Sequence, residues 1–192
     1  MDFFLETFSN HIYPLSKEGF QLYKSIFTEK RFLKGDIIAE SGNITSNFYI
    51  VIEGLVRSFV IDEKAKEHTR SFFTPISSTG PLETLITKEP SMSNYQCLTD
   101  CVLLEGDFSK FEKLMKKSHE LTTYYSKTLE IVFLIMIKRI TELSTLNATE
   151  VYKNLIKEIP NINNLIPQYQ IASYLNITPV QLSRIRKKLY SK

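Results

Sequence analysis

The residues with the clearest chemistry lie close to the C-terminal end of the 192-residue chain. Val180, Arg184 and Lys187 recur at helical spacing and therefore project from one side of a helix, with Ser183 and Lys188 beside them. An arginine can bind guanine O6 and N7 with two hydrogen bonds, a valine can contact a thymine methyl group, and a lysine can neutralise a phosphate. This helix face has the chemistry of a surface that reads duplex DNA.

The charge distribution points to the same end of the chain. Residues 168–192 carry five bases and no acid, whereas residues 1–167 have a net charge of −2. A basic segment on a near-neutral body is typical of a module that binds a polyanion. A solvated basic tail would give the same charge balance. The charge therefore supports a DNA-binding helix here but does not by itself establish one.

The sequence offers few residues suited to metal binding, to an iron–sulfur cluster or to catalysis. His11, His68 and His119 are far apart and form no pair with metal-ligand spacing. An iron–sulfur cluster needs about four cysteines. Cys97 and Cys101 are interpreted as small buried thiols, with a redox-sensing pair as the alternative. We expect no catalytic residue, no metal and no enzyme, and keep a β-roll enzyme with an accessory helical domain as a less favoured alternative.

Two short helices joined by a tight turn must position the reading face. Ala172 is small where two helices would cross, and Asn176, four residues later, tolerates a left-handed turn. Thr178 is a good N-cap and Pro179 a good first helical residue. The buried side of the second helix would be the apolar stripe Leu182, Ile185 and Leu189. This spacing favours a helix-turn-helix over an ordinary helical hairpin with a basic surface.

Ten residues of this motif are expected to contact DNA, because they lie at the start of the first helix or on the open side of the second. They are Gln168, Tyr169, Thr178, Pro179, Val180, Gln181, Ser183, Arg184, Lys187 and Lys188.

The front half of the chain predicts a helix followed by a sheet. Ser16 precedes an apolar pattern from Phe20 to Phe27 that suits an N-capped helix, and Gly35-Asp36 and Glu53-Gly54 read as turns. Short β-branched and aromatic runs predict strands at Arg31–Lys34, Ile37–Ala39, Asn47–Glu53, Leu55–Ile61, Thr69–Phe73, Asn94–Leu98 and Cys101–Glu105. So many short strands indicate a small antiparallel barrel or jelly roll.

A long helix is expected from Ser118 to about Leu146, because this stretch contains neither Gly nor Pro. Its segment Ile131–Ile137 is apolar all round and must be covered on more than one side. A second copy of the helix is the economical cover, which predicts a homodimer; a central helix in a monomeric bundle is the alternative. The residues assigned to dimerisation are Leu121, Tyr124, Ile131 and Ile135. Asn147 and Glu150 then form a capping-box-like start of another helix.

Neither a membrane segment nor an export signal is expected. The longest apolar run has seven residues, far fewer than the roughly 20 of a membrane helix. The N-terminus carries acids where a secretory signal carries bases. The predicted location is the cytoplasm.

The chain resembles the Crp/Fnr superfamily of bacterial transcription regulators over essentially its whole length. The resemblance rests on Phe32–Ile38, Gly42 and Asn47–Arg57 in the front half, and on Ile166–Leu189 in the back half. It implies an α+β protein with a cyclic-nucleotide-binding-like β-roll (residues 1–117), a dimerisation helix (118–146) and a C-terminal winged-helix-type helix-turn-helix domain (147–192).

The phosphate-binding cassette of cyclic-nucleotide-binding members is where the chain departs from the resemblance. Glu83 can stand for the acid that binds ribose and Ser91 for the hydroxyl, although Glu83 could equally be a surface carboxylate. The arginine is missing, with Pro90 or Met92 in its place. A cyclic phosphate without a cationic fork loses its strongest contact, so cyclic AMP is not expected as a cofactor.

The sequence thus predicts a cytoplasmic, homodimeric regulator that binds an inverted repeat in double-stranded DNA. A cyclic-nucleotide-responsive sensor-regulator is the first alternative. RNA polymerase and an unidentified small-molecule effector stay open as further partners.

Overall fold

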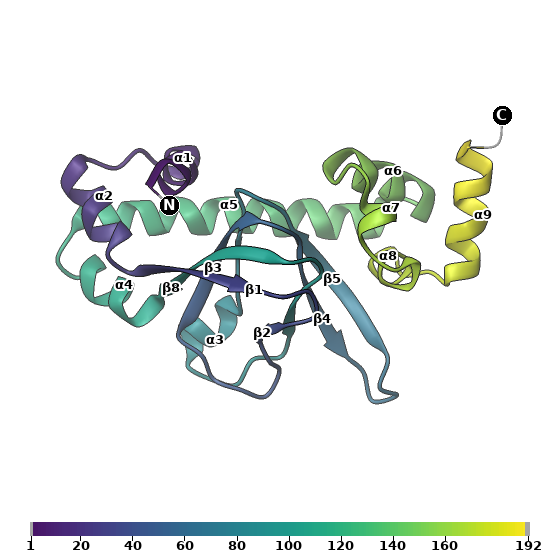
Figure 1. Ribbon diagram of the computed structural model, residues 1–192, viewed down its shortest axis with the longest axis horizontal. Helices are drawn as coiled ribbons and strands as arrows, with labels where there is room; N and C mark the ends of the chain where they lie inside the picture. Colours follow the sequence, from purple (N-terminus) through teal and green to yellow (C-terminus); the bar gives the residue numbers. More distant parts are fainter. Residues whose placement is uncertain (1, 191–192) are drawn as a thin grey trace.

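The computed structural model describes residues 2–190 and has three parts along its length, the β-roll, a long helix and a C-terminal helical unit (Figure 1). The helices are α1 (Asp2–Ile12), α2 (Lys17–Lys24), α3 (Leu82–Thr87), α4 (Phe108–Met115), α5 (His119–Thr145), α6 (Ala148–Glu158), α7 (Ile162–Leu165), α8 (Gln168–Tyr174) and α9 (Pro179–Tyr190). The strands are β1 (Phe27–Phe32), β2 (Ile37–Ala39), β3 (Asn47–Glu53), β4 (Val56–Ile61), β5 (Glu67–Phe73), β6 (Ser78–Thr79), β7 (Asn94–Cys97) and β8 (Cys101–Asp107).

The roll consists of two four-stranded sheets, so the predicted α+β class with an antiparallel jelly roll is confirmed. Their strand orders are β1-β8-β3-β6 and β2-β7-β4-β5, and every pairing is antiparallel. Apolar side chains from both sheets, Tyr49, Val51, Val56 and Leu103 among them, fill the space between them. Strand β5 lies at the edge of the second sheet, so no other strand pairs with its outer side.

The predicted turn at Glu53-Gly54 is confirmed, and it requires glycine. Gly54 has a φ of +96°, a region that L side chains rarely adopt. A Cβ atom there would lie 2.5 Å from both the Asp100 carbonyl oxygen and the Cys101 sulfur. The turn therefore fixes how closely the β3–β4 connection approaches the β7–β8 connection.

Two boundaries near the N-terminus differ from the sequence prediction. The strand expected at Arg31–Lys34 runs over Phe27–Phe32, and helix α2 ends at Lys24 before reaching Phe27. The reason is tertiary, since the Phe27 ring packs edge-on against Tyr23 and Phe48 in the core of the roll. Helices α1, α3 and α7 and the two-residue strand β6 were not predicted.

Helix α5 begins where the sequence predicted, with the Ser118 side chain accepting a hydrogen bond from the Leu121 N–H. Its first turns, however, lie in the core that this chain forms by itself. Leu121 is 0% exposed and Tyr124 2% exposed, and the Tyr124 ring packs 4.8 Å from that of Tyr23. The assignment of Leu121 and Tyr124 to dimerisation is therefore wrong, because α1, α2 and α4 already cover them.

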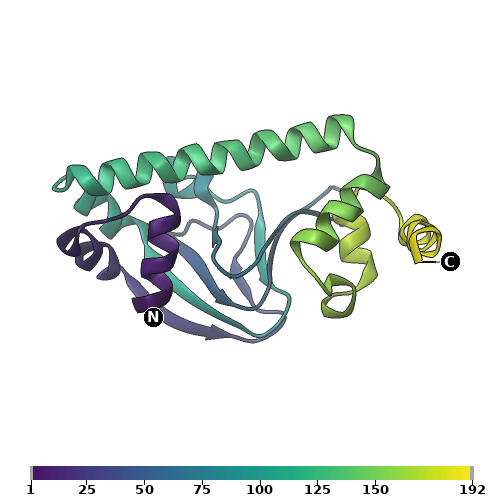
Figure 2. The same cartoon turned by 90° about the horizontal axis from the view of Figure 1, so that it is seen from above.

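The second half of α5 carries a run of exposed apolar residues. Figure 2 shows the roll and the helical unit on one side of this helix, with its opposite side uncovered by the chain. The exposed large apolar residues are Ile131, Phe133, Leu134, Ile135, Met136, Ile137, Ile140 and Leu143, which we call the α5 apolar surface. Despite this run, no helix within residues 2–190 has the length and apolarity needed to cross a bilayer.

The C-terminal unit is a helix-turn-helix on a supporting helix. The predicted capping box is present, with the Asn147 side chain accepting from the Glu150 N–H and the Glu150 side chain accepting from the Asn147 N–H. Asn176 has the left-handed φ of +55° that the turn was expected to need, and Ala172 is buried at the crossing. Between residues 108 and 190 there is no strand, so the wing implied by the resemblance is not found in this segment.

Candidate nucleic-acid interface

The N-terminal turn of α9 is fixed by reciprocal hydrogen bonds. Thr178 Oγ1 accepts from the Gln181 N–H at 3.2 Å, and Gln181 Oε1 accepts from the Thr178 N–H at 2.8 Å. This is a capping box with glutamine as the third helical residue. Leu182 on the opposite side is fully buried, with Ile185 and Leu189 packed against the same core. The helix is thus anchored along its apolar stripe and held at its start.

All ten residues predicted to contact DNA are exposed, and the structure gathers them at the outer end of the molecule. Gln168 and Tyr169 begin α8, Thr178 caps α9, and the other seven follow along α9. Within residues 2–190, Arg184, Lys187 and Lys188 form no ion pair with an acid, so their charges are available to an external anion. The arrangement can present an arginine and a valine to base edges and lysines to a phosphate backbone.

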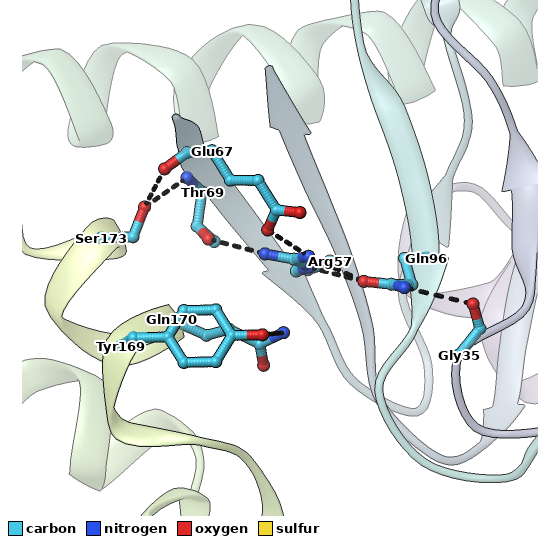
Figure 3. Close-up of polar contacts among 8 residues, drawn as sticks. All are labelled: Gly35, Arg57, Glu67, Thr69, Gln96, Tyr169, Gln170 and Ser173. Carbon is cyan, nitrogen blue, oxygen red and sulfur yellow. Dashed lines mark hydrogen bonds and ion pairs between the residues drawn. The ribbon is translucent and has the colours of Figure 1, made fainter. Parts of the chain in front are cut away.

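Helix α8 is bound directly to the roll, a contact that sequence reasoning did not find. Ser173 Oγ accepts from the Thr69 N–H and donates to the Glu67 carbonyl oxygen, both at 2.9 Å (Figure 3). These two groups belong to the open edge of β5. The helix-turn-helix and the roll are therefore joined by hydrogen bonds as well as by the chain.

A buried arginine organises the sheet beneath this contact. Arg57 on β4 is 2% exposed, and its Nη2 lies 2.6 Å from Glu67 Oε2 and 2.7 Å from Gln96 Oε1. Its guanidinium group also lies 4.0 Å over the Phe59 ring, and Gln96 Nε2 donates onward to the Gly35 carbonyl oxygen. Arg57 is the last residue of the barrel signature, so its position was visible in the sequence, but its burial was not.

A hollow of about 150 Å³ separates the β4–β5 hairpin from the helix-turn-helix. Lys66 and His68 line it from the hairpin, and Asn176, Thr178 and Gln181 are among the residues on the other side. His68 Nε2 lies 2.8 Å from Asp62 Oδ2, and this hydrogen bond lowers the pKa of the Asp62 carboxyl group. The hairpin thus approaches the start of α9, at Thr178 and Gln181.

The two predicted pocket residues do come together. Ser91 Oγ lies 3.5 Å from Glu83 Oε1 and donates to the Ser93 carbonyl oxygen at 2.8 Å. Ser91 is buried, and Glu83 is half-buried on α3. Glu83 is therefore not the exposed surface carboxylate that the sequence left open.

The cations near this pair are engaged with other partners. Lys88 Nζ lies 3.1 Å from Glu112 Oε2 on α4 and 5.2 Å from the centre of the Phe108 ring. Arg70, on β5, places Nη1 3.1 Å from Ser93 Oγ. Sequence reasoning missed Arg70 because it is far from the cassette along the chain, and only the sheet brings it near.

The two cysteines are buried at the ends of β7 and β8, as expected for structural thiols. Cys101 Sγ lies 3.3 Å from the Thr99 carbonyl oxygen. A hydrogen bond from Cys97 lowers the pKa of Cys101 to about 7, while the same contact and burial raise the pKa of Cys97. At 0% and 2% exposure, neither sulfur is open to a reagent in solvent. Within residues 2–190 no cluster of His, Cys, Asp and Glu suits a metal ion.

Comparison with known proteins agrees with this architecture. Residues 29–118 match the cyclic nucleotide-binding domain. Among solved structures, FixK2 of Bradyrhizobium japonicum superposes with a TM-score of 0.71 at 16% identity, covering 86% of this chain and 85% of FixK2. A protein of Eubacterium rectale assigned to the Crp/Fnr transcriptional regulators gives a TM-score of 0.70 at 15% identity, with 91% and 83% covered.

The catabolite activator protein of Thermus thermophilus is also similar, with a TM-score of 0.56 at 18% identity and coverage of 93% of this chain and 85% of that protein. No curated protein matches the chain in sequence. Identities this low establish a common fold. The chain therefore shares its fold with the Crp/Fnr-type regulators among these structures, and its residues 29–118 match a cyclic nucleotide-binding domain.

Proposed function

We propose that the protein is a transcription regulator that binds a specific DNA sequence through α8 and α9. The observation that carries the proposal is the exposed face of α9, where Val180, Arg184 and Lys187 stand opposite a fully buried Leu182. A recognition helix needs such a face, anchored below and open above, to enter a major groove. The same proposal places the protein in the cytoplasm and includes RNA polymerase as a partner.

We further propose that the regulator acts as a homodimer on an inverted repeat. The α5 apolar surface supports this, because an exposed apolar run of this size on a protein is typical of an interface. Pairing two α5 helices would cover that surface and relate two reading helices by a two-fold axis. Two such helices fit half-sites whose centres are about 34 Å, or one DNA turn, apart.

The test is to select bound fragments from a pool of random duplexes and then to vary the spacer of the recovered site. We expect an inverted repeat, and we expect a spacer changed by half a turn, about 5 base pairs, to abolish tight binding, since the second helix would face the wrong side of the duplex. Fluorescence anisotropy measures the affinities. Equal affinity for every spacer would contradict the dimeric reading, and recovery of no common sequence would contradict the regulator itself.

We also propose that DNA binding does not depend on cyclic AMP. Pro90 and Met92 stand where a cationic fork would hold the cyclic phosphate, Lys88 is paired with Glu112, and Arg70 is bonded to Ser93. Calorimetry with cyclic AMP and with cyclic GMP is expected to detect no tight binding. The matched variant Pro90→Arg is expected to gain affinity, because it restores a charge-assisted contact to phosphate.

The alternative, a cyclic-nucleotide-responsive sensor, is favoured by one observation, the proximity of Glu83 to Ser91. A dissociation constant below about 1 µM for either nucleotide, equivalent to roughly 8 kcal/mol of binding free energy, would select that alternative.

A further inference from the structure

The edge of β5 is completed by a helix side chain. Strand β5 is the last strand of its sheet, so the Thr69 N–H and the Glu67 carbonyl on that side have no neighbouring strand. The Ser173 hydroxyl bonds both groups at 2.9 Å and thus supplies the pair of hydrogen bonds that another strand would make (Figure 3). Unsatisfied backbone groups at a buried edge are costly, which gives this contact a defined geometry.

The segment that Ser173 contacts is itself held in place. Arg57 binds the Glu67 side chain at 2.6 Å and places Nη1 3.5 Å from Thr69 Oγ1, while its other hydrogen bonds reach Gln96 on β7. Arg57 is 2% exposed, and its guanidinium group connects the strands β4, β5 and β7 by hydrogen bonds. The anchor point on the roll is therefore rigid.

The next residue, Tyr174, is held between the roll and α5. Its ring lies 5.1 Å from that of Phe72 on β5, and the Arg139 guanidinium group of α5 lies 3.9 Å from the centre of the same ring. Arg139 Nη2 also donates to the Tyr174 carbonyl oxygen at 2.7 Å. Leu55 and Leu98 of the roll share one apolar core with the helix-turn-helix. The reading unit is thus fixed both to the roll and to the helix that would carry the two-fold axis.

We infer that Ser173 is a positioning residue that sets the spacing of half-sites the dimer accepts. The inference rests on the proposed function and goes beyond it. Ser173 faces β5 and not the reading face, so it contributes nothing to the contact of one helix with one half-site. It determines the distance and the angle between the two α9 helices of the dimer, because it ties each helix-turn-helix to its β-roll and to α5. A helix-turn-helix released from the roll can adapt to several spacings.

The experiment compares wild type with Ser173→Ala on inverted repeats whose spacer differs from the best one by one or two base pairs, and on a single half-site. In the wild type, we expect affinity to fall steeply away from the best spacer. Loss of two hydrogen bonds shifts the docked state by about tenfold, so the variant is expected to lose about tenfold at the best spacer and to discriminate less among the others. Half-site affinity is expected to stay unchanged.

Three further measurements complete the design. Ser173→Thr retains the hydroxyl group and is expected to restore the wild-type spacer profile, whereas Ser41→Ala, which removes an exposed hydroxyl group in a turn of the roll, is expected to change nothing. Amide hydrogen exchange at Thr69 is expected to accelerate in Ser173→Ala, because its N–H loses its acceptor.

The inference is overturned if Ser173→Ala keeps the wild-type spacer profile, or if it loses half-site affinity to the same degree, which would show a general structural defect. If the wild type binds no duplex at all, the proposed function fails, and with it the role in spacing. Unchanged exchange at Thr69 in a wild type that does bind DNA would overturn the contact between Ser173 and β5 but not the proposed function. The failure of the inference and the failure of the proposed function are therefore distinguishable.

Discussion

Phe133→Glu on α5 is expected to convert the proposed homodimer into a monomer and to abolish tight binding to an inverted repeat. Phe133 is 63% exposed on α5, and the exposed residues Ile137 and Ile140 follow it at helical spacing. Placing an unpaired carboxylate in a buried seam costs several kcal/mol, enough to raise the dissociation constant of a dimer by more than about a hundredfold. Ile135→Glu, at a residue that is 61% exposed, is expected to act in the same direction.

Light scattering gives the oligomeric state, and anisotropy with one half-site and with the full repeat separates dimerisation from contact with DNA. The matched control is Leu33→Glu, which puts the same charge on an exposed apolar residue of the roll and is expected to remain dimeric. A wild-type protein that scatters as a monomer, or a Phe133→Glu variant that stays dimeric, would refute the role of the α5 apolar surface.

Arg184→Ala is expected to cost about 1–3 kcal/mol at the cognate site and to relax the preference for one base pair, because it removes a two-bond contact to a base edge. Lys188→Ala is expected to weaken specific and non-specific binding alike and to reduce the slope of log affinity against log salt by about one, the signature of one lost phosphate contact. Both side chains are exposed on α9, and neither is paired with an acid within residues 2–190.

Anisotropy on cognate and scrambled duplexes at several salt concentrations distinguishes the two kinds of contact. Each variant serves as the control for the other, since each removes one positive charge from the same helix. If Arg184→Ala lowers affinity for both duplexes equally, Arg184 contacts phosphate and the assumed orientation of α9 in the groove is wrong.

The sequence by itself determined the features whose cause lies within a few residues. Asn176 adopts the left-handed conformation, Asn147 forms a capping box, and Gly54 makes the turn that was predicted for it. Capping and turn preferences arise from contacts between neighbours in the chain, so the residue types suffice to predict them. The alternation of the strands and the apolar stripe of α9 follow in the same way from periodicity.

The tertiary structure alone decided which apolar residues are buried within the chain and which are exposed. Leu121 and Phe133 belong to one uninterrupted apolar pattern, yet the first is buried by α1, α2 and α4 and the second is open. Periodicity shows that a face must be covered but carries no information about what covers it.

The same holds for the contacts that join the reading unit to the roll. Ser173 meets Glu67 and Thr69 across more than a hundred residues of chain, and Arg70 approaches Ser93 only because two strands lie in one sheet. Nothing in the local sequence of a serine or an arginine distinguishes these from exposed ones. Their partners are fixed by the pairing of the strands and the docking of α8, since contacts between residues distant in the chain exist only once the whole fold has formed.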